Sequence, residues 1–296
     1  LVILIRGWFP AHVGTAVGIA AGGIGVGIFG LIPLAQLLID WYDWRWAFRV
    51  FAAVVVGWIL PATIWLLREP PKPAFPVQAQ PASEVGAPQG CLTYWTLAQA
   101  VWSWRFWALG IVLFTNNSAI TLLMIHQVAY LVDHGVPAMA AATIGGIVGL
   151  TSIAGKVGWG YLMDRTLREL VYTLASLSFA LSLGFLVLAG TYPATALPYA
   201  YAILLGLGYA ITAPLAPAAS NDLFGGPEFS TIFGTIHISL GLGTAAGAWA
   251  GGKVFDLTGS YAAAMWGALG LICLSCALLW LVAPRRPNPA PLRNDQ

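Results

Sequence analysis

Residues 138–168 read AMAAATIGGIVGLTSIAGKVGWGYLMDRTLR, and this run carries the clearest signal of the type of fold. Up to residue 162 it contains one charged side chain, Lys156, and no proline. A run of this kind is long enough to cross a bilayer, because a spanning helix needs about 20 predominantly apolar residues. The charged residues from Asp164 to Arg168 then mark the end of the helix. The stretch therefore predicts one transmembrane helix followed by a short charged loop.

Seven further segments share this length and apolar character: 13–39, 46–67, 104–131, 170–190, 198–222, 229–254 and 261–283. The whole chain is 59% hydrophobic and 8% charged, whereas an average soluble domain is roughly 25% charged. A soluble fold is therefore excluded, and a formal net charge of +2 leaves no basic stripe for a nucleic-acid partner. We predict an all-α, polytopic transmembrane helical bundle with eight complete spans in the lipid bilayer.

One long polar gap divides these spans into two groups. Residues 68–103 are rich in Pro, Gln, Ala and Ser, which is typical of a linker. We therefore expect residues 1–67 to be the remainder of an N-terminal bundle, 104–283 a C-terminal six-helix bundle, and 284–296 a tail. Nine Lys and Arg residues fall on the linker side and three on the other. This bias predicts a cytoplasmic linker and C-terminus in a cell membrane, plasma or inner.

The first and last pairs of spans look like copies of each other. Sliding the sequence on itself by 216 residues matches three glycines and one aspartate: Gly18 with Gly234, Gly25 with Gly241, Gly27 with Gly243, and Asp40 with Asp256. Such a parallel repeat is typical of a transporter built from two halves. A six-span second half then implies a six-span first half. We therefore expect an N-terminally truncated chain with eight of twelve spans.

The loop sequence GYLMDRTLR, from Gly160 to Arg168, resembles the G-x-x-x-D-R-x-x-R motif between helices eight and nine of the major facilitator superfamily. Three more stretches are similar to the monocarboxylate and oxalate/formate transporter branch: RGWFP at 6–10, DWRWAF at 43–48 and HQVAYLVDHG at 126–135. The resemblance covers nearly the whole chain as helices five to twelve. It implies the superfamily fold and transport of a small organic anion by alternating access.

Among the charged residues of the sequence, only Lys156 lies well inside a predicted span. A cation near the bilayer centre costs about 2.5–3.5 kcal/mol on insertion scales, so Lys156 is a candidate functional residue. Its neighbours Gly149, Ser152 and Gly160 form a narrow face of small residues. The amine either extends to the cytoplasmic surface or balances the charge of an anion in a central cavity.

The resemblance favours the second interpretation of Lys156. Related carriers have a cation at this place in helix eight that contacts the substrate carboxylate, and animal monocarboxylate carriers have an acidic residue one turn earlier, where this chain has Ser152. A single cation matches a single carboxylate, because the second charge of a dicarboxylate would be unpaired in a low dielectric.

Four other polar residues within the spans are candidates for substrate binding. His126 and His237 have imidazoles that titrate near neutral pH and could accept a co-transported proton; the alternative is a neutral histidine bonded to a neighbouring helix. Asn116 and Asn117 lie in mid-span, where they either line a cavity or bridge helices.

The charged loop is a candidate conformational latch. By resemblance, Gly160, Asp164, Arg165 and Arg168 would close the cytoplasmic side through ion pairs or helix-end contacts, whereas the alternative is ordinary charge at a helix end. Such a latch biases a two-state equilibrium without touching the substrate.

These features predict a secondary active transporter of a small, monocarboxylate-like organic anion, coupled to protons or to anion exchange and acting as a monomer. The alternative is an efflux carrier for apolar or cationic compounds, which predicts acidic residues within the spans. An enzyme is not expected, because the spans contain no H-E-x-x-H or G-x-S-x-G motif. The cysteines have no second Cys/His pair, so no metal or cofactor is expected.

Overall fold

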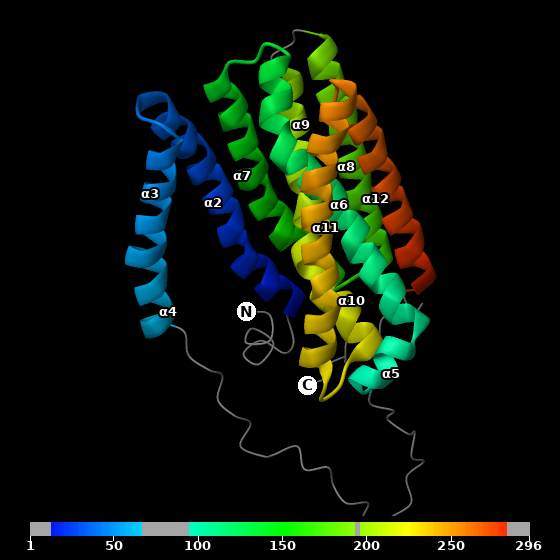
Figure 1. Cartoon of the computed structure of the whole chain (residues 1–296). Helices are drawn as coiled ribbons and strands as arrows, with labels where there is room; N and C mark the ends of the chain where they lie inside the picture. The colour runs from blue at the N-terminus through cyan, green and yellow to red at the C-terminus, as the bar shows by residue number, and fades with distance from the viewer. Residues whose placement is uncertain (1–12, 67–94, 193–195, 283–296) are drawn as a thin grey trace, which may run out of the picture.

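The computed structural model describes residues 13–66, 95–192 and 196–282, and all its regular elements there are helical (Figure 1). In chain order they are α2 (Val13–Trp41), α3 (Trp44–Val54), the π-helical turn η1 (Val55–Ile59), α4 (Leu60–Leu66), α5 (Leu97–Trp102), α6 (Trp104–Asp133), α7 (Ala138–Met163), α8 (Arg168–Thr191), α9 (Ala196–Ala210), α10 (Thr212–Phe224), α11 (Phe229–Thr258) and α12 (Ala262–Val282). The predicted tail, residues 1–12 and most of the predicted linker lie outside the described residues.

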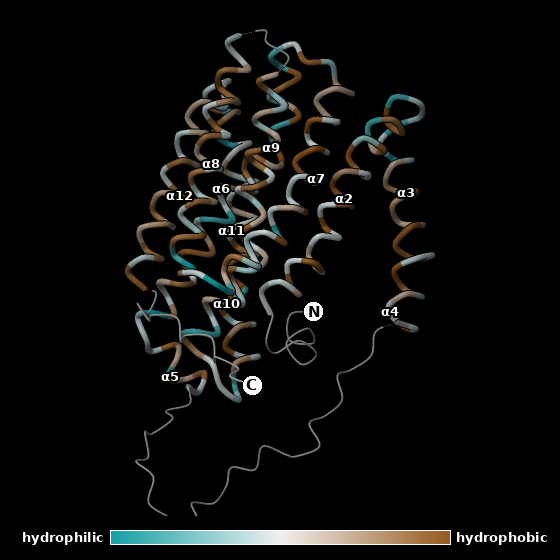
Figure 2. Tube along the Cα trace, turned by 180° about the vertical axis from the view of Figure 1, so that it is seen from behind, coloured by the Kyte–Doolittle hydropathy of each residue, from teal (hydrophilic) through white to brown (hydrophobic). Residues whose placement is uncertain are grey.

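Eight helical segments in the described ranges are long and apolar enough to cross a membrane. Two of them are composite, because α3, η1 and α4 form one span and α9 and α10 form another. Hydrophobic residues extend along the helices, whereas the turn between α2 and α3 is hydrophilic (Figure 2). The predicted all-α, eight-span transmembrane bundle is thereby confirmed.

Both composite spans are interrupted next to a proline. Pro61 has no N–H group to donate to the carbonyl four residues earlier. The preceding turn is π-helical, and in it the N–H of Leu60 donates to the carbonyl of Val55. In the other composite span the helix breaks at Ile211. There Pro214 cannot donate to the carbonyl of Ala210, so the last turn of α9 is not continued regularly into α10.

The helices surround two clusters of buried apolar side chains. One cluster includes Phe106, Leu109 and Phe224, and the other includes Ile144 and Met265. In Figure 1, α6 to α12 form the main body, α2 runs along α7, and α3 with α4 lies on the outer side of α2. Many large apolar side chains on the outer faces are exposed, which suits helices that face lipid.

Glycines bring the backbones of α2 and α7 into direct contact. A Cβ atom built on Gly149 would lie 2.6 Å from the carbonyl oxygen of Gly25, and one on Gly18 would overlap the carbonyl of Lys156. Side chains at these positions would push the two helices apart. We call Gly18, Gly25 and Gly149 the glycine seam.

The predicted repeat agrees with the helix boundaries. Adding 216 to the bounds of α2 gives 229–257, and α11 covers Phe229–Thr258. The two helices use their glycines differently, since Gly25 packs on α7 whereas its counterpart Gly241 has no atom within 4 Å of a built Cβ among the described residues. Conversely, Gly243 packs on the backbone of α6, whereas a Cβ on Gly27 would meet only Leu31.

The predicted linker at 68–103 differs from the structure at its end. Residues 97–102 form the short helix α5, and Trp95 packs edge-on against Phe224 with ring centroids 5.5 Å apart. A capping box formed by Thr96 and Gln99 begins the helix. This Thr-x-x-Gln pattern is the local signal that the sequence analysis missed. The division of the chain into two bundles stays a prediction.

Candidate substrate site

Lys156 lies inside the protein, with 1% of its surface exposed. Its ammonium Nζ donates a hydrogen bond to Ser152 Oγ at 3.1 Å and lies 4.7 Å from the centroid of the Tyr209 ring. The amine therefore does not extend to the membrane surface. Of the two interpretations offered by the sequence, the structure agrees with an amine that faces the interior of the bundle.

Neutral groups surround this amine. Ser152 is fully buried, and its hydroxyl accepts from Lys156 while it donates to the carbonyl of Gly149 at 2.7 Å. Among the described residues no carboxylate forms an ion pair with Lys156. A buried cation without a counter-charge is costly. The site is therefore electrostatically suited to accept an anion.

Tyr209 joins this site from the other side. It lies at the end of α9, two residues before the break at Ile211, and its ring faces the Lys156 amine. No local pattern of residues indicates this contact, because one tyrosine in an apolar span has no spacing that pairs it with a residue on α7.

Asn116 belongs to a polar network inside the bundle. Its Oδ1 accepts a hydrogen bond from the hydroxyl of Tyr172 on α8 at 3.0 Å, and that hydroxyl also contacts Ser275 on α12. Ser275 in turn donates to the carbonyl of Val112 at 3.0 Å. Asn116 thus connects α6 to α8 directly, and to α12 through Tyr172 and Ser275, and no contact with Lys156 is found for it among the described residues.

Asn117 and His126 connect α6 to the backbone of α11. Asn117 Nδ2 donates to the carbonyl of Leu240 at 3.0 Å, and His126 Nε2 lies 3.2 Å from the carbonyl oxygen of Ala248. A carbonyl oxygen only accepts, so Nε2 carries a proton in this contact. These two side chains therefore bridge helices in this structure and lie apart from the Lys156 amine.

His237 lies elsewhere again. It is exposed on α11, with its ring centroid 5.1 Å from that of Phe233. The structure therefore brings together Lys156 and Ser152 from the predicted substrate-binding set and adds Tyr209. His126 lies between α6 and α11 and His237 on an exposed face of α11, so neither belongs to this group.

The predicted latch loop makes contacts in two directions. Asp164 Oδ2 accepts hydrogen bonds from the backbone N–H and the hydroxyl of Thr15, at 3.1 and 3.0 Å. Thr15 belongs to the first turn of α2, where N–H groups lack helical partners and a negative charge is favourable. This contact joins the end of α7 to the start of α2.

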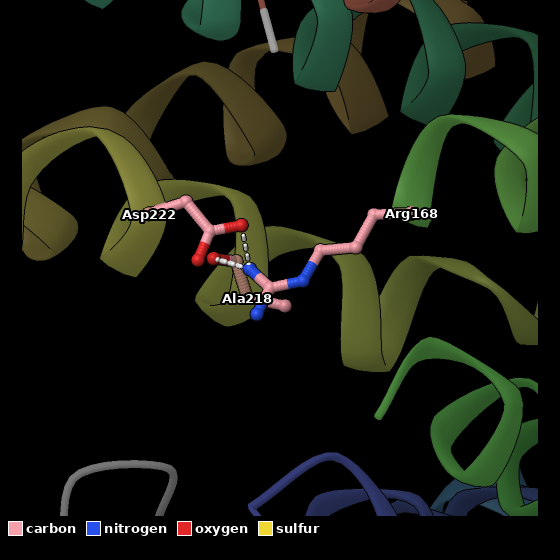
Figure 3. A network of polar contacts seen from close by, with 3 residues as sticks. All are labelled: Arg168, Ala218 and Asp222. Atoms are coloured by element: carbon pink, nitrogen blue, oxygen red, sulfur yellow. Dashed lines mark hydrogen bonds and ion pairs between the residues drawn. The ribbon is translucent and has the colours of Figure 1, made fainter. Parts of the chain in front are cut away.

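Arg168 connects two helices at the same end of the molecule (Figure 3). Its guanidinium donates to the Asp222 carboxylate and to the carbonyl of Ala218, so the start of α8 is tied to the end of α10. Arg165 lies 4.0 Å from the ring centroid of Tyr161. Two of the four predicted latch residues, Asp164 and Arg168, thus make contacts between helices.

Comparison with known proteins decides the family. A family model described as the Major Facilitator Superfamily matches residues 1–212. The chain belongs to this superfamily. Membership confirms the resemblance inferred from the charged loop, and superfamily members are transporters, so an enzyme is not indicated.

Similar members of the superfamily are named as monocarboxylate transporters. The chain is 26% identical over 298 residues to monocarboxylate transporter 12-B of Danio rerio, with 93% of this chain and 62% of that protein covered. It is 27% identical to monocarboxylate transporter 13 of Rattus norvegicus (86% and 56% covered) and 26% identical to monocarboxylate transporter 4 of Mus musculus (88% and 54% covered). The chain thus spans somewhat over half the length of these superfamily relatives.

Proposed function

We propose that this protein takes part in secondary active transport of a small monocarboxylate, with Lys156 as the counter-charge for the substrate. The observation that carries the proposal is the buried amine, which contacts a hydroxyl and an aromatic ring but no carboxylate of the residues that the structure describes. The names of the similar transporters support the substrate class.

The chemistry of the amine suits a single carboxylate. An ammonium is a point charge with three donors, and Ser152 accepts one of them. The other donors are available to the two oxygens of a carboxylate. The ring contact with Tyr209 is a cation–π interaction worth on the order of 0.5–2 kcal/mol, and it holds the amine in place beside a bound carboxylate.

Alternating access requires contacts that exist in one state and break in the other. We infer that the Asp164–Thr15 contact is one of these, because it joins α7 to α2 across the glycine seam at one end of the molecule. Opening of that end would remove both hydrogen bonds while the Arg168–Asp222 contact between α8 and α10 stays intact.

Charge balance favours a coupled process. An anion that enters a cell works against about 2.3 kcal/mol per charge per 100 mV, and a co-transported proton or an exported anion cancels this term. His237, which is exposed, and His126, whose Nδ1 has no hydrogen-bond partner among the described residues, are the candidate proton acceptors.

Replacement of the cation tests the proposal. In cells that express the protein, Lys156→Ala should lower uptake of radiolabelled lactate, pyruvate or formate by about tenfold or more, since loss of a buried charge contact costs at least about 1.4 kcal/mol. Lys156→Arg should retain part of the uptake, because it keeps the charge.

Lys253→Ala is the matched control, because it removes an exposed cation on α11 and should leave uptake unchanged. Surface expression of all variants is measured by antibody labelling. Normal carboxylate uptake by Lys156→Ala at normal expression would refute the role of Lys156. Transport of cations instead of carboxylates would support the alternative of an efflux carrier.

A further inference from the structure

The short helix α5 and the start of α6 expose three tryptophans within six residues. Trp102 is 91% exposed, Trp104 58% and Trp107 60%, and the exposed Arg105 lies between them. We call these four residues the tryptophan surface. No acidic residue occurs between residues 95 and 110 of the sequence. Arg105 therefore adds a positive charge among the three indole rings, while the Glu228 carboxylate lies at the start of α5 beside Leu97.

The rest of α5 is attached to the protein, and this attachment fixes the outward direction of Trp102. Ala100 is fully buried in the apolar cluster at this end, with Leu97 and Val101 packed against that cluster. The carboxylate of Glu228 accepts a hydrogen bond from the backbone N–H of Leu97 at 2.8 Å. Because the opposite side of α5 is buried, Trp102 points away from the bundle.

The chain turns sharply between α5 and α6. Ser103 is both the C-cap of α5 and the N-cap of α6, and its backbone is extended. The indole N–H of Trp107 donates to the carbonyl of Val101 at 2.9 Å across this turn. No hydrogen bond is recorded for the indole N–H groups of Trp102 and Trp104 within the described residues, so both can donate to an external acceptor.

The depth of the surface follows from the length of α6. Its 30 residues extend for about 45 Å, whereas the hydrocarbon core of a bilayer is about 30 Å thick. The excess length, together with Arg105 near the start of α6 and Asp133 at its end, indicates that both ends of the helix reach the headgroup region. Figure 1 shows α5 at the same end of the bundle as the end of α10. Two exposed acidic residues, Asp222 near the end of α10 and Glu228 beside the start of α5, belong to this end.

We propose that the tryptophan surface binds the headgroup region of anionic phospholipids in the leaflet on that side. Indole rings favour this region because they combine an apolar body with an N–H donor. Arg105 supplies the charge that prefers an anionic headgroup over a zwitterionic one. Bound lipid would hold α5, and with it the Glu228 end of α11, at a fixed level in the membrane.

Tryptophan fluorescence in vesicles tests this proposal. The full chain is reconstituted into phosphatidylcholine vesicles that contain brominated phosphatidylglycerol or brominated phosphatidylcholine, with bromine at shallow or deep acyl positions. The emission of Trp102 is the difference between the unmodified protein and Trp102→Phe. We expect shallow bromine to quench this emission about twofold more than deep bromine, and phosphatidylglycerol to quench it more than phosphatidylcholine.

Two variants separate depth from charge. Arg105→Gln should remove the preference for phosphatidylglycerol but keep the shallow quenching. Trp266→Phe provides the matched control, because Trp266 is 72% exposed one turn into α12 and has no basic residue within four positions. The emission of Trp266, obtained as the difference between the unmodified protein and this variant, should be quenched equally by the two brominated lipids.

Four results would overturn the proposal. Quenching of Trp102 by aqueous iodide but by neither lipid would place it in water, and stronger quenching by deep bromine would place it in the hydrocarbon core. Protection from every quencher would mean that another protein segment covers it. Equal quenching by the two headgroups, in the unmodified protein, would remove the anionic preference.

Discussion

At the scale of single residues, two neutral side chains position the buried amine of Lys156. The Ser152 hydroxyl lies one turn earlier on the same helix, whereas the Tyr209 ring approaches from α9. Ser152 contacts the amine whenever α7 is helical, because residues four apart share a face. Tyr209 contacts it only while α7 and α9 are packed together, so the ring is the partner that a conformational change can remove.

Substitution of Tyr209 should distinguish the ring from the hydroxyl. Tyr209→Phe keeps the ring and should leave KM for the carboxylate nearly unchanged. Tyr209→Leu removes the cation–π contact and should raise KM about threefold to tenfold, which corresponds to about 0.7–1.4 kcal/mol. The measurement is concentration-dependent uptake. Identical KM values for the two variants would show that the ring does not position the amine.

At the scale of elements, α2 and α7 pack as closely as two helices can, because glycines face backbone carbonyls along the glycine seam. Close contact of this kind excludes lipid and water from the boundary between the two predicted bundles. It also explains why α2 is rich in glycine although glycine weakens a helix. Gly23 of α2 is not in such a contact, since a Cβ built on it would meet no atom within 4 Å among the described residues.

This contrast gives a matched pair of variants on one helix. Gly25→Val should destabilise the protein by about 1–3 kcal/mol, because the added side chain overlaps the backbone of α7. Gly23→Val should have little effect, since its position is open. Thermal unfolding in detergent, followed by fluorescence, measures both. Equal melting temperatures would mean that α2 and α7 are not in close contact in the protein.

At the scale of the whole molecule, the two predicted bundles meet at α2 and α7, and hydrogen bonds between Asp164 and Thr15 connect these helices at one end of the boundary. Thr15 supplies two donors to one carboxylate oxygen, and both come from the other side of the boundary. Hydrogen bonds to a charged group contribute roughly 1.5–3 kcal/mol, which is enough to shift a two-state equilibrium by an order of magnitude.

Removal of this carboxylate should open that end more often. With Cys91, Cys273 and Cys276 replaced by serine, a cysteine introduced by Ser152→Cys reports access to the buried site. Asp164→Ala should raise its rate of maleimide labelling about tenfold or more, in line with the loss of roughly 1.5–3 kcal/mol of contact. Asp256→Ala removes an exposed carboxylate at the far end of α11 and serves as the control. Unchanged labelling in Asp164→Ala would contradict the latch.

The amino-acid sequence by itself determined the eight spans, the charged loop and the identity of the buried cation. These follow from local properties, because the length and apolar character of a segment decide whether it crosses a membrane. The tertiary structure alone decided which polar groups meet: Tyr209 with Lys156, Asn117 and His126 with the backbone of α11, and Asp164 with Thr15. These pairs join residues far apart in the sequence. Their contacts depend on how the helices pack, which no local pattern of residues specifies.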